Sequence, residues 1–394
     1  MKDTLWTKEF ILLIMANSLA VCSFQLLFPT LPVFLSEHGN NSQEVGIVMG
    51  IFTLSAVLVR PFTAVGSRRW GKKVFLNVGQ LISLLAICTY ILGVTFFSAL
   101  SIRIIHGIGF GISTTLFAVI LADLTPSVRR GESIGYLGFG IAVTSSLAPF
   151  LGLWVFNGFG PIYLFSVTAL ALLLSMLCVV FISKPVPVDP PDSNSSRNVF
   201  GSLIEKTAVF PAFLAFLLGL CFGSVMSFMA LFGKEIDISN VGWFFFANII
   251  GSFSARLIAG RVFDRKGPAF TIIPGAIMGT MGLVLLSQTT STYQLILSAV
   301  LYGLGSGSIL PSLQAWIMNM VASNRRTEAT AMFYNSFDIG IGGGAVILGF
   351  LASVSSYSFM YFCTAVIMFS LLVIYVCSKL RKKRSNHSIE MKSY

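Results

Sequence analysis

The sequence predicts an all-α integral membrane protein whose 12 transmembrane helices form two pseudo-symmetric six-helix halves. Of its 394 residues, 55% are hydrophobic and only 10% are charged, and the mean hydropathy is +0.85. Soluble domains carry about 25% charged residues, so a water-soluble fold is excluded. Apolar stretches of about 20 residues, the length that crosses a hydrocarbon core, follow one another from Phe10 to Lys379. An internal repeat at an offset of 196 residues indicates the two halves.

The spans are expected to be helices rather than strands. Strands of membrane β-barrels give alternating segments of about 10 residues, whereas the stretch 80–102 is apolar without alternation. We divide the apolar stretches at clusters of glycine, proline and charged residues. The predicted spans are 10–34, 45–66, 74–96, 98–122, 132–155, 161–183, 208–232, 240–262, 270–288, 293–321, 328–353 and 357–378.

The loops between these spans differ sharply in charge. One alternate set carries almost all the basic residues, whereas the other carries only Lys234. Because basic loops stay in the cytoplasm, we expect a multi-pass protein of the cell (plasma) membrane, the inner membrane in a bacterium, with both termini cytoplasmic. The basic loop residues are Arg68, Arg69, Lys72, Lys73, Arg129, Arg130, Lys184, Arg197, Lys206, Arg261, Arg265, Lys266, Arg325 and Arg326.

The net charge of +11 is therefore attributed to membrane topology, and no nucleic-acid partner is expected. The expected partners are the lipid bilayer and a small-molecule substrate, with the chain acting as a monomer. The six cysteines all lie in apolar stretches and show neither disulfide nor metal-ligand spacing. The first apolar stretch is longer than a signal-peptide core, so we expect the first span to stay in the mature protein.

A polar segment rich in proline and serine, 184–206, is predicted to be a cytoplasmic linker. It separates an N-terminal six-helix bundle (1–183) from a C-terminal bundle with a basic tail (207–394). The offset of 196 residues places Arg60 over Arg256 and Gly71 over Gly267 without a gap. It also aligns Gly107, Gly109 and Gly111 with Gly303, Gly305 and Gly307, and Arg129, Arg130 and Glu132 with Arg325, Arg326 and Glu328. A duplicated six-helix unit in parallel orientation explains this pattern.

Each half carries a basic loop with a glycine after its second span. The second-half loop reads Gly260-Arg-Val-Phe-Asp264-Arg265-Lys266-Gly267, and the first-half loop has Arg68 where an aspartate is expected. Twelve helices in two halves with these loops resemble the major facilitator superfamily over essentially the whole chain. The resemblance implies a cytoplasmic gate that contacts the other half, whereas the alternative is that the charges only set topology. The candidate gating residues are Arg68, Arg69, Gly71, Lys72, Asp123, Asp264, Arg265 and Gly267.

Two further motifs narrow this resemblance. Arg103-Ile-Ile-His106-Gly107-Ile-Gly109 is similar to the fourth-helix motif of drug:proton antiporters, with histidine in place of glutamine. Ala148-Pro149-Phe-Leu-Gly152 resembles a weakened copy of their fifth-helix motif, in which Pro149 and Gly152 are the matching residues. The resemblance implies export rather than uptake.

Asp338 is the one carboxylate that the sequence places near the middle of a span. A charge at mid-bilayer costs at least about 2.5–3.5 kcal/mol, so it usually has a function. Because burial favours a protonated carboxyl group, we expect Asp338 to couple transport to protons, with structural pairing to a polar neighbour as the alternative.

Arg103 and His106 share a helix face near the outer end of the fourth span and are further coupling candidates. The alternatives are that Arg103 reaches the membrane surface and that His106 packs as a neutral side chain. Other polar residues at depth are candidate substrate-binding groups or ordinary interhelical hydrogen-bonding groups. These residues are Asn17, Gln25, Asn248, Gln314 and Asn335.

These features together predict a proton-coupled secondary active exporter of a small amphipathic or apolar molecule, of the multidrug efflux type, working by alternating access. The pattern around Asp338 also resembles exporters of zwitterionic metallophores, in which Arg103 and His106 would suit carboxylate groups. A sugar or nutrient uptake permease is the other alternative. The sequence of segment 66–73 is similar to a phosphate-binding loop but lacks the final Ser or Thr of that motif. It also follows a membrane helix, whereas the motif requires a strand. We therefore expect no enzyme activity, no metal and no cofactor.

Overall fold

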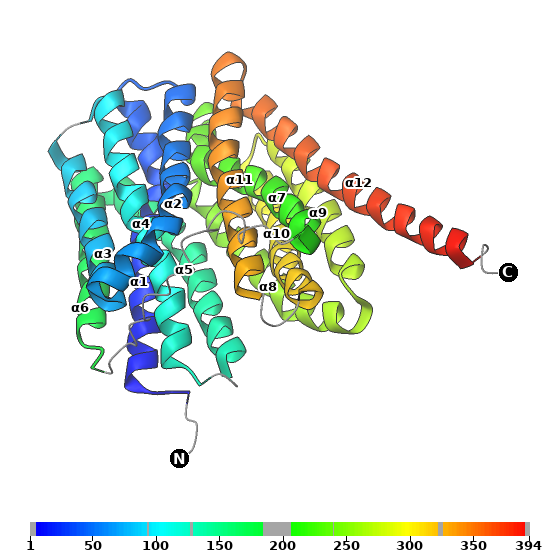
Figure 1. Ribbon diagram of the computed structural model, residues 1–394. Helices are drawn as coiled ribbons and strands as arrows, with labels where there is room; N and C mark the ends of the chain where they lie inside the picture. Colours follow the sequence, from blue (N-terminus) through cyan, green and yellow to red (C-terminus); the bar gives the residue numbers. More distant parts are fainter. Residues whose placement is uncertain are drawn as a thin grey trace. The chain divides into compact units, whose positions relative to one another are not determined.

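The computed structural model describes residues 5–92, 94–126, 129–183, 206–238, 240–321 and 326–390. Within these ranges it contains 12 helices that are long and apolar enough to cross a membrane, which confirms the predicted all-helical fold class (Figure 1). Apart from Lys206, the predicted linker 184–206 lies outside the described residues.

The helices of the first half begin and end within a few residues of the predicted spans. They are α1 (Lys8–Glu37), α2 (Ser42–Trp70), α3 (Lys72–Thr89), α4 (Phe96–Leu124), α5 (Arg130–Phe159) and α6 (Pro161–Val180). One difference lies at the end of α3, where the chain tightens into a 3-10 turn, η1 (Tyr90–Leu92). Thr95 then caps α4 by accepting a hydrogen bond from the backbone of Ser98, so the new helix starts at a defined residue.

The second half follows the same order. It contains the 3-10 turn η3 (Lys206–Ala208), then α7 (Val209–Glu235), α8 (Gly242–Lys266), α9 (Ala269–Ser287), α10 (Thr292–Met320), α11 (Arg326–Val354) and α12 (Tyr357–Glu390). Helix α12 continues beyond the predicted end at residue 378. Hydropathy falls there, but lysine and arginine are good helix formers, so a helix continues where the apolar span stops.

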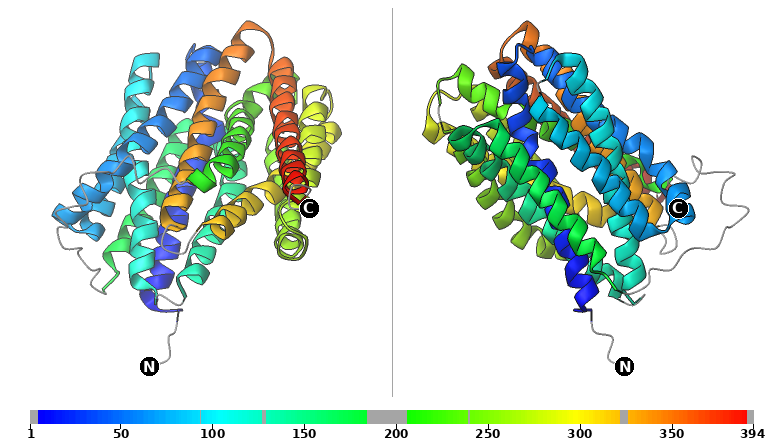
Figure 2. Two further views of the ribbon diagram at one scale, coloured as in Figure 1. Left: turned by 45° about the vertical axis from the view of Figure 1, so that its right-hand side comes forward. Right: turned by 90° about the vertical axis from the view of Figure 1, so that its left-hand side faces the viewer.

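The chain divides into two compact units. Unit 1 comprises residues 1–199, 226–234 and 345–353, and unit 2 comprises residues 200–225, 235–344 and 354–394. Unit 1 therefore contains α1 to α6 together with C-terminal parts of α7 and α11. Figure 2 shows the helices of unit 1 lying side by side in both views, with α2 and α3 next to α4.

Small residues bring α4 against its neighbours in unit 1, and the repeat brings α10 against its neighbours in unit 2. A Cβ atom added to Gly107, Gly109 or Gly111 would collide with backbone of Phe52, Gly79 or Ala56. A Cβ atom added to Gly303, Gly305 or Gly307 would collide with backbone of Asn248, Gly275 or Ser252. Each glycine and its contact residue keep the offset of the sequence repeat from their counterparts. The sequence repeat is thus also a repeat of helix packing.

The loop glycines of the two halves have the same role. Gly71 ends α2 with a φ of 83°, and Gly267 ends α8 with a φ of 82°. Residues with a side chain rarely adopt such positive φ values. The glycine in each basic loop therefore stops the helix and turns the chain toward the next span.

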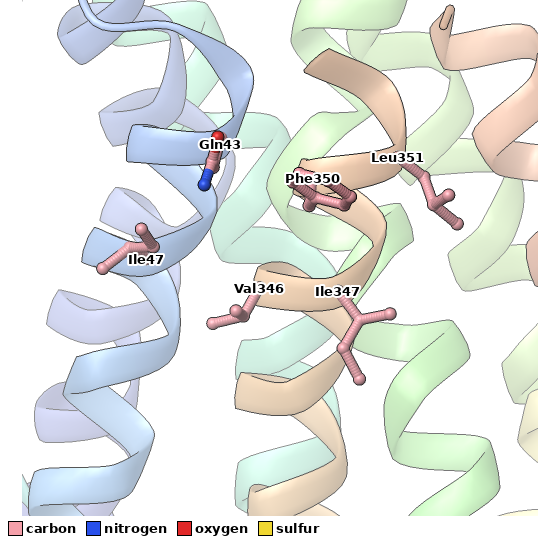
Figure 3. A pocket seen from close by; sticks show the side chains of 6 residues that line it. All are labelled: Gln43, Ile47, Val346, Ile347, Phe350 and Leu351. Atoms are coloured by element: carbon pink, nitrogen blue, oxygen red, sulfur yellow. The ribbon is translucent and has the colours of Figure 1, made fainter. Parts of the chain in front are cut away.

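Two close contacts within unit 1 join α2 to the C-terminal part of α11. A Cβ atom added to Gly46 would collide with the carbonyl oxygen of Ala345, and one added to Gly349 would meet the Cα atom of Gly46. Beside this contact lies an apolar pocket of about 360 Å³. Figure 3 shows its lining residues, Gln43, Ile47, Val346, Ile347, Phe350 and Leu351. Gln43 is the one polar side chain among these six, so the pocket has few groups that could form hydrogen bonds.

Candidate functional site

Two lysines of the first basic loop in unit 1 contact groups of the same half. Lys72 Nζ lies 2.9 Å from the Asp123 carboxylate, which joins the start of α3 to the end of α4. Lys73 Nζ donates hydrogen bonds of 2.9 and 2.7 Å to the carbonyl oxygens of Val180 and Ile182 after α6. In this structure the two gating candidates Lys72 and Asp123 thus pair with each other, and the two lysines connect three helices of one unit.

The remaining gating candidates lie on exposed helix ends. Arg68 and Arg69 are exposed in the last turn of α2, as are Asp264 and Arg265 in the last turn of α8. A carboxylate at a helix C-terminus opposes the helix dipole, so Asp264 receives no support from its own helix. Asp123 has a similar position on α4 but is compensated by Lys72. The two acidic gating candidates therefore have different environments.

Arg103 lies inside unit 1 with its side chain 0% exposed. Its Nη2 atom lies 3.1 Å from the Met49 sulfur, and its guanidinium carbon lies 4.9 Å from the centre of the Phe52 ring. The Nε and Nη1 atoms have no hydrogen-bond partner among the described residues. The side chain does not reach the surface, which removes that alternative. A thioether and an aromatic ring are weak partners for a buried charge.

His106 lies one turn farther along α4 and is also buried. Its ring packs edge-on against Phe52, with the ring centres 5.0 Å apart, and its Nδ1 atom has no hydrogen-bond partner among the described residues. Tyr90 of η1 adds a third buried polar group near Arg103, and its hydroxyl is likewise without a hydrogen bond in the described part of the chain. Unit 1 therefore contains a buried polar cluster of Arg103, His106 and Tyr90, of which the sequence analysis identified only the first two.

The α1 candidates and the α5 motif belong to the packing of α1 against α5. Gln25 Nε2 donates a 2.9 Å hydrogen bond to Ser145 Oγ on α5. A Cβ atom added to Gly152 would collide with the Leu26 carbonyl oxygen, and Pro149 lies in the same helix one turn earlier. Asn17 is 2% exposed, and its Nδ2 atom has no hydrogen-bond partner within the described ranges. Gln25 and Gly152 thus have structural contacts, while Asn17 retains an unused donor.

In unit 2, Asp338 lies near the middle of α11, between the helix ends at Arg326 and Val354. Tyr334 precedes it by one turn on the same helix face. The Tyr334 hydroxyl accepts a 3.0 Å hydrogen bond from Gln314 Nε2 on α10 and interacts electrostatically with Asp338. The structure thus brings together Asp338 and Gln314, two of the predicted site residues, around a tyrosine that the sequence analysis did not single out.

Arg256 is the second site residue that the sequence analysis missed. It lies in the interior of α8, several turns from either end of the helix, and it interacts electrostatically with the Tyr334 hydroxyl. Its Nε atom is buried without a hydrogen-bond partner among the described residues. An available signal was its position inside the predicted span 240–262, where a charge is costly. The sequence analysis used it only as the counterpart of Arg60 in the repeat.

The other second-half candidates are Asn248 and Asn335. Asn248 lies where α8 meets α10, and its Oδ1 atom is 3.5 Å from Ser252 Oγ. Asn335 is half-buried on α11 and has an interaction partner of its own. Within the part of the chain that the structure describes, no three His, Cys, Asp or Glu side chains gather as a metal site requires. In unit 2, Tyr334 accepts the hydrogen bond from Gln314 and interacts electrostatically with Arg256 and Asp338.

Comparison with known proteins gives long but divergent matches. The chain is 25% identical over 397 residues to the multidrug resistance protein MdtG of Citrobacter koseri, covering 96% of each protein. It is 22% identical to the multi-drug resistance efflux pump PmrA of Streptococcus pneumoniae, covering 89% of this chain and 91% of PmrA. An uncharacterised MFS-type transporter of Methanocaldococcus jannaschii is 25% identical, covering 90% of this chain and 93% of the relative.

Solved structures share the fold at lower identity. The nucleoside transporter NupG superposes with a TM-score of 0.74 at 15% identity, over 93% of this chain and 100% of NupG. An inward-facing, occupied bacterial homologue of the lysosomal transporter Spinster has a TM-score of 0.75 at 16% identity, over 94% of this chain and 96% of that protein. The family model described as Major Facilitator Superfamily matches residues 13–293 and 211–392. With its 12 helices and this match, the chain belongs to the major facilitator superfamily of transporters.

Proposed function

We propose that this transporter is a proton-coupled exporter of small amphipathic or apolar molecules and works by alternating access. Export is supported by the similarity to MdtG and PmrA, both named as multidrug resistance or efflux proteins, and by the two motifs that resemble drug:proton antiporters. Proton coupling is supported by one observation above all, the position of Asp338 within α11.

The distribution of carboxylates gives Asp338 this role. Of the 15 acidic residues in the sequence, Asp338 alone lies near the middle of a predicted span. A carboxylate in a membrane is expensive unless it is paired or protonated. Asp338 interacts electrostatically with Tyr334 and lies on a helix that glycines hold close to α7. A carboxylate at this depth, in a helix that packs closely on its neighbour, suits a step in which binding of a proton changes the preferred conformation.

The proposed orientation follows from the loops. The side that carries Arg68, Arg69 and the basic tail is taken as cytoplasmic, because positive loops are retained there. Export then moves the molecule away from this side while protons move toward it. The plasma membrane, or the inner membrane of a bacterium, is the proposed location.

The experiment is uphill transport by Asp338→Asn in vesicles with an imposed pH gradient. A panel of dyes, drugs and cell-made metabolites is first compared in cells with and without the gene, and the compound with the largest difference is used in the vesicles. Asp338→Asn should abolish gradient-driven accumulation while keeping downhill exchange. Asp338→Glu should keep part of the activity, because a carboxyl group remains but is displaced by about one methylene group.

Asp237→Asn is the matched control. Asp237 is exposed, lies between α7 and α8, and has a φ of 55°, a conformation that asparagine also tolerates. This variant should accumulate the compound as the wild type does. Full accumulation by Asp338→Asn would assign the coupling role to another group, with His106 and Asp123 as the next candidates.

A further inference from the structure

Arg103 carries a buried charge that the proposed coupling role of Asp338 does not use. It lies about two turns into α4, and its side chain is 0% exposed. Its Nη2 atom lies 3.1 Å from the Met49 sulfur, while its Nε and Nη1 atoms have no hydrogen-bond partner among the described residues. A guanidinium stays charged in proteins and has five N–H donors. A thioether and an aromatic ring therefore leave both the charge and most of the donors of Arg103 uncompensated.

The carboxylates of the described first half do not neutralise this charge. All five lie in the first or last turn of a helix, far from the interior of α4. Glu9 lies about four turns before Phe24, the α1 residue whose ring stacks on Phe52 beside Arg103. The other four have partners of their own, which are Lys234 for Glu37, the backbone N–H of Asn41 for Glu44, Lys72 for Asp123 and Arg129 for Glu132.

The internal repeat indicates that the packing of this helix does not need an arginine. The offset of 196 residues places Ala299 of α10 at the position that Arg103 has in α4. Ala299 is also 0% exposed, and the glycine contacts of α10 repeat those of α4. Because an alanine suffices at the equivalent position, the charge of Arg103 points to a binding role rather than to helix packing.

His106 adds a second buried polar group beside Arg103. The Phe52 ring contacts both side chains, with the guanidinium carbon of Arg103 4.9 Å from its centre and the His106 ring centre 5.0 Å away. The two residues are three positions apart and share one face of α4. His106 is 1% exposed, and its Nδ1 atom has no hydrogen-bond partner within the described ranges. Unused hydrogen-bonding groups of both residues thus lie in one buried region of unit 1.

Close helix packing limits the size of a partner for these groups. A Cβ atom added to Gly107 or Gly111 would collide with the backbone of Phe52 or Ala56, so α4 lies directly against α2. An organic molecule with an apolar body would have to separate these helices. A buried charge without a counterion is strongly unfavourable in a membrane. A single inorganic anion of about the size of chloride would neutralise the guanidinium and use its free donors.

We propose that unit 1 binds a chloride-sized inorganic anion between Arg103 and His106 as a resident counterion. The Nε and Nη1 groups of Arg103 donate hydrogen bonds to the anion, and His106 donates through Nδ1 in the tautomer that carries a proton there. The anion neutralises the buried charge and stabilises the packing of α4 on α2. It is not the transported molecule, so the proposal depends neither on proton coupling nor on the direction of transport.

The test is thermal unfolding of the purified full-length protein in a neutral detergent. Sodium gluconate is replaced stepwise by sodium chloride at constant ionic strength, so general screening of the net charge of +11 stays the same. The unfolding temperature of the wild type should rise with chloride and then level off, because the anion binds the folded state. Bromide should act as chloride does. Acetate should not, because its methyl group has no room beside the two side chains.

Three variants separate the site from general anion effects. Arg103→Gln should abolish the rise with chloride, and in gluconate it should unfold at or above the wild-type temperature because the uncompensated charge is gone. His106→Phe should raise the half-saturating chloride concentration by about 10- to 100-fold, the loss expected for a hydrogen bond to a charged group. Arg69→Gln makes the same change in net charge at an exposed position of α2 and should keep the full rise.

Crystals grown with bromide locate the anion by its anomalous scattering, and the peak should lie between the Arg103 guanidinium and the His106 ring. If Arg103→Gln does not fold, this peak and the titration of His106→Phe decide. The proposal is overturned if the wild type unfolds at one temperature in chloride and gluconate, if Arg103→Gln keeps the rise, or if bromide binds elsewhere only. Stabilisation by acetate as strong as by chloride would also overturn it, because Arg103 would then bind carboxylates.

Discussion

Asp264 occupies a position that its own helix makes unfavourable. It lies in the last turn of α8, where the helix dipole disfavours a negative charge by about 0.3–1 kcal/mol, and its side chain is exposed. An exposed carboxylate in this unfavourable position is consistent with the predicted gating role of Asp264. We attribute it to a charge-assisted contact made in another conformation of the transport cycle, as the family resemblance implies.

Asp264→Asn should therefore lower the transport rate by about tenfold, because a charged hydrogen bond contributes about 1.5–3 kcal/mol. Expression and the unfolding temperature should be unchanged or slightly raised, because the charge opposes the helix dipole. The measurement is transport per molecule of purified protein, with the thermal unfolding curve as the second measurement. Arg68→Asp, at the corresponding loop of the first half, is the control and should preserve folding. A wild-type transport rate in Asp264→Asn would indicate that the charges of the loop motif only set the membrane topology.

Single residues also show where the sequence was informative and where it was not. Arg103 and Asp338 are recognisable because a charge in an apolar stretch has few explanations. Lys72 and Asp123 were both predicted to lie near the gate, but nothing in the sequence pairs residues that lie 51 positions apart. Tyr334 has no sequence signal of its own, since one tyrosine in a span is usual. Its importance comes from its hydrogen bond with Gln314 and its electrostatic interactions with Arg256 and Asp338.

At the scale of helices, the glycine contacts make a direct prediction. In Gly303→Ala the new methyl group would overlap the Asn248 carbonyl oxygen, and α8 and α10 must separate. We expect a loss of about 1–3 kcal/mol in stability, as for other overpacked sites. Gly107→Ala should behave in the same way because α4 meets α2 at the equivalent contact. Thermal unfolding in detergent measures both losses.

Gly135→Ala provides the control for this prediction. Gly135 also lies inside a helix, α5, but a Cβ atom there has no neighbour within 4 Å. The substitution should leave stability unchanged or raise it by up to about 1 kcal/mol, because alanine favours helices more than glycine does. Equal changes in stability in Gly303→Ala and Gly135→Ala would show that Gly303 is not needed for close packing of α8 and α10.

At the scale of the whole molecule, the charge of the loops predicts its orientation. Fourteen basic residues lie in one set of loops and only Lys234 in the other, so we predict that both termini and the linker lie in the cytoplasm. Single cysteines at Ser193 and Tyr293, in a protein whose six native cysteines have been replaced, test this. A membrane-impermeant thiol reagent outside intact cells should label Tyr293→Cys, which is 86% exposed at the start of α10, and not Ser193→Cys. Labelling of Ser193→Cys from outside would show that the topology is the opposite of the predicted one.

The sequence alone determined the fold class, the positions of the 12 spans and the internal repeat that relates the two halves. Hydropathy, helix caps and glycine turns act over one or two turns of helix, so they can be read from neighbouring residues. The tertiary structure decided which distant side chains meet. Lys72 pairs with Asp123, the Arg103 guanidinium contacts a thioether and an aromatic ring, and Tyr334 interacts electrostatically with Arg256 and Asp338. These interactions depend on how each helix is rotated about its axis and on the angles at which helices cross. Both are fixed only when helices that are far apart in the sequence pack together.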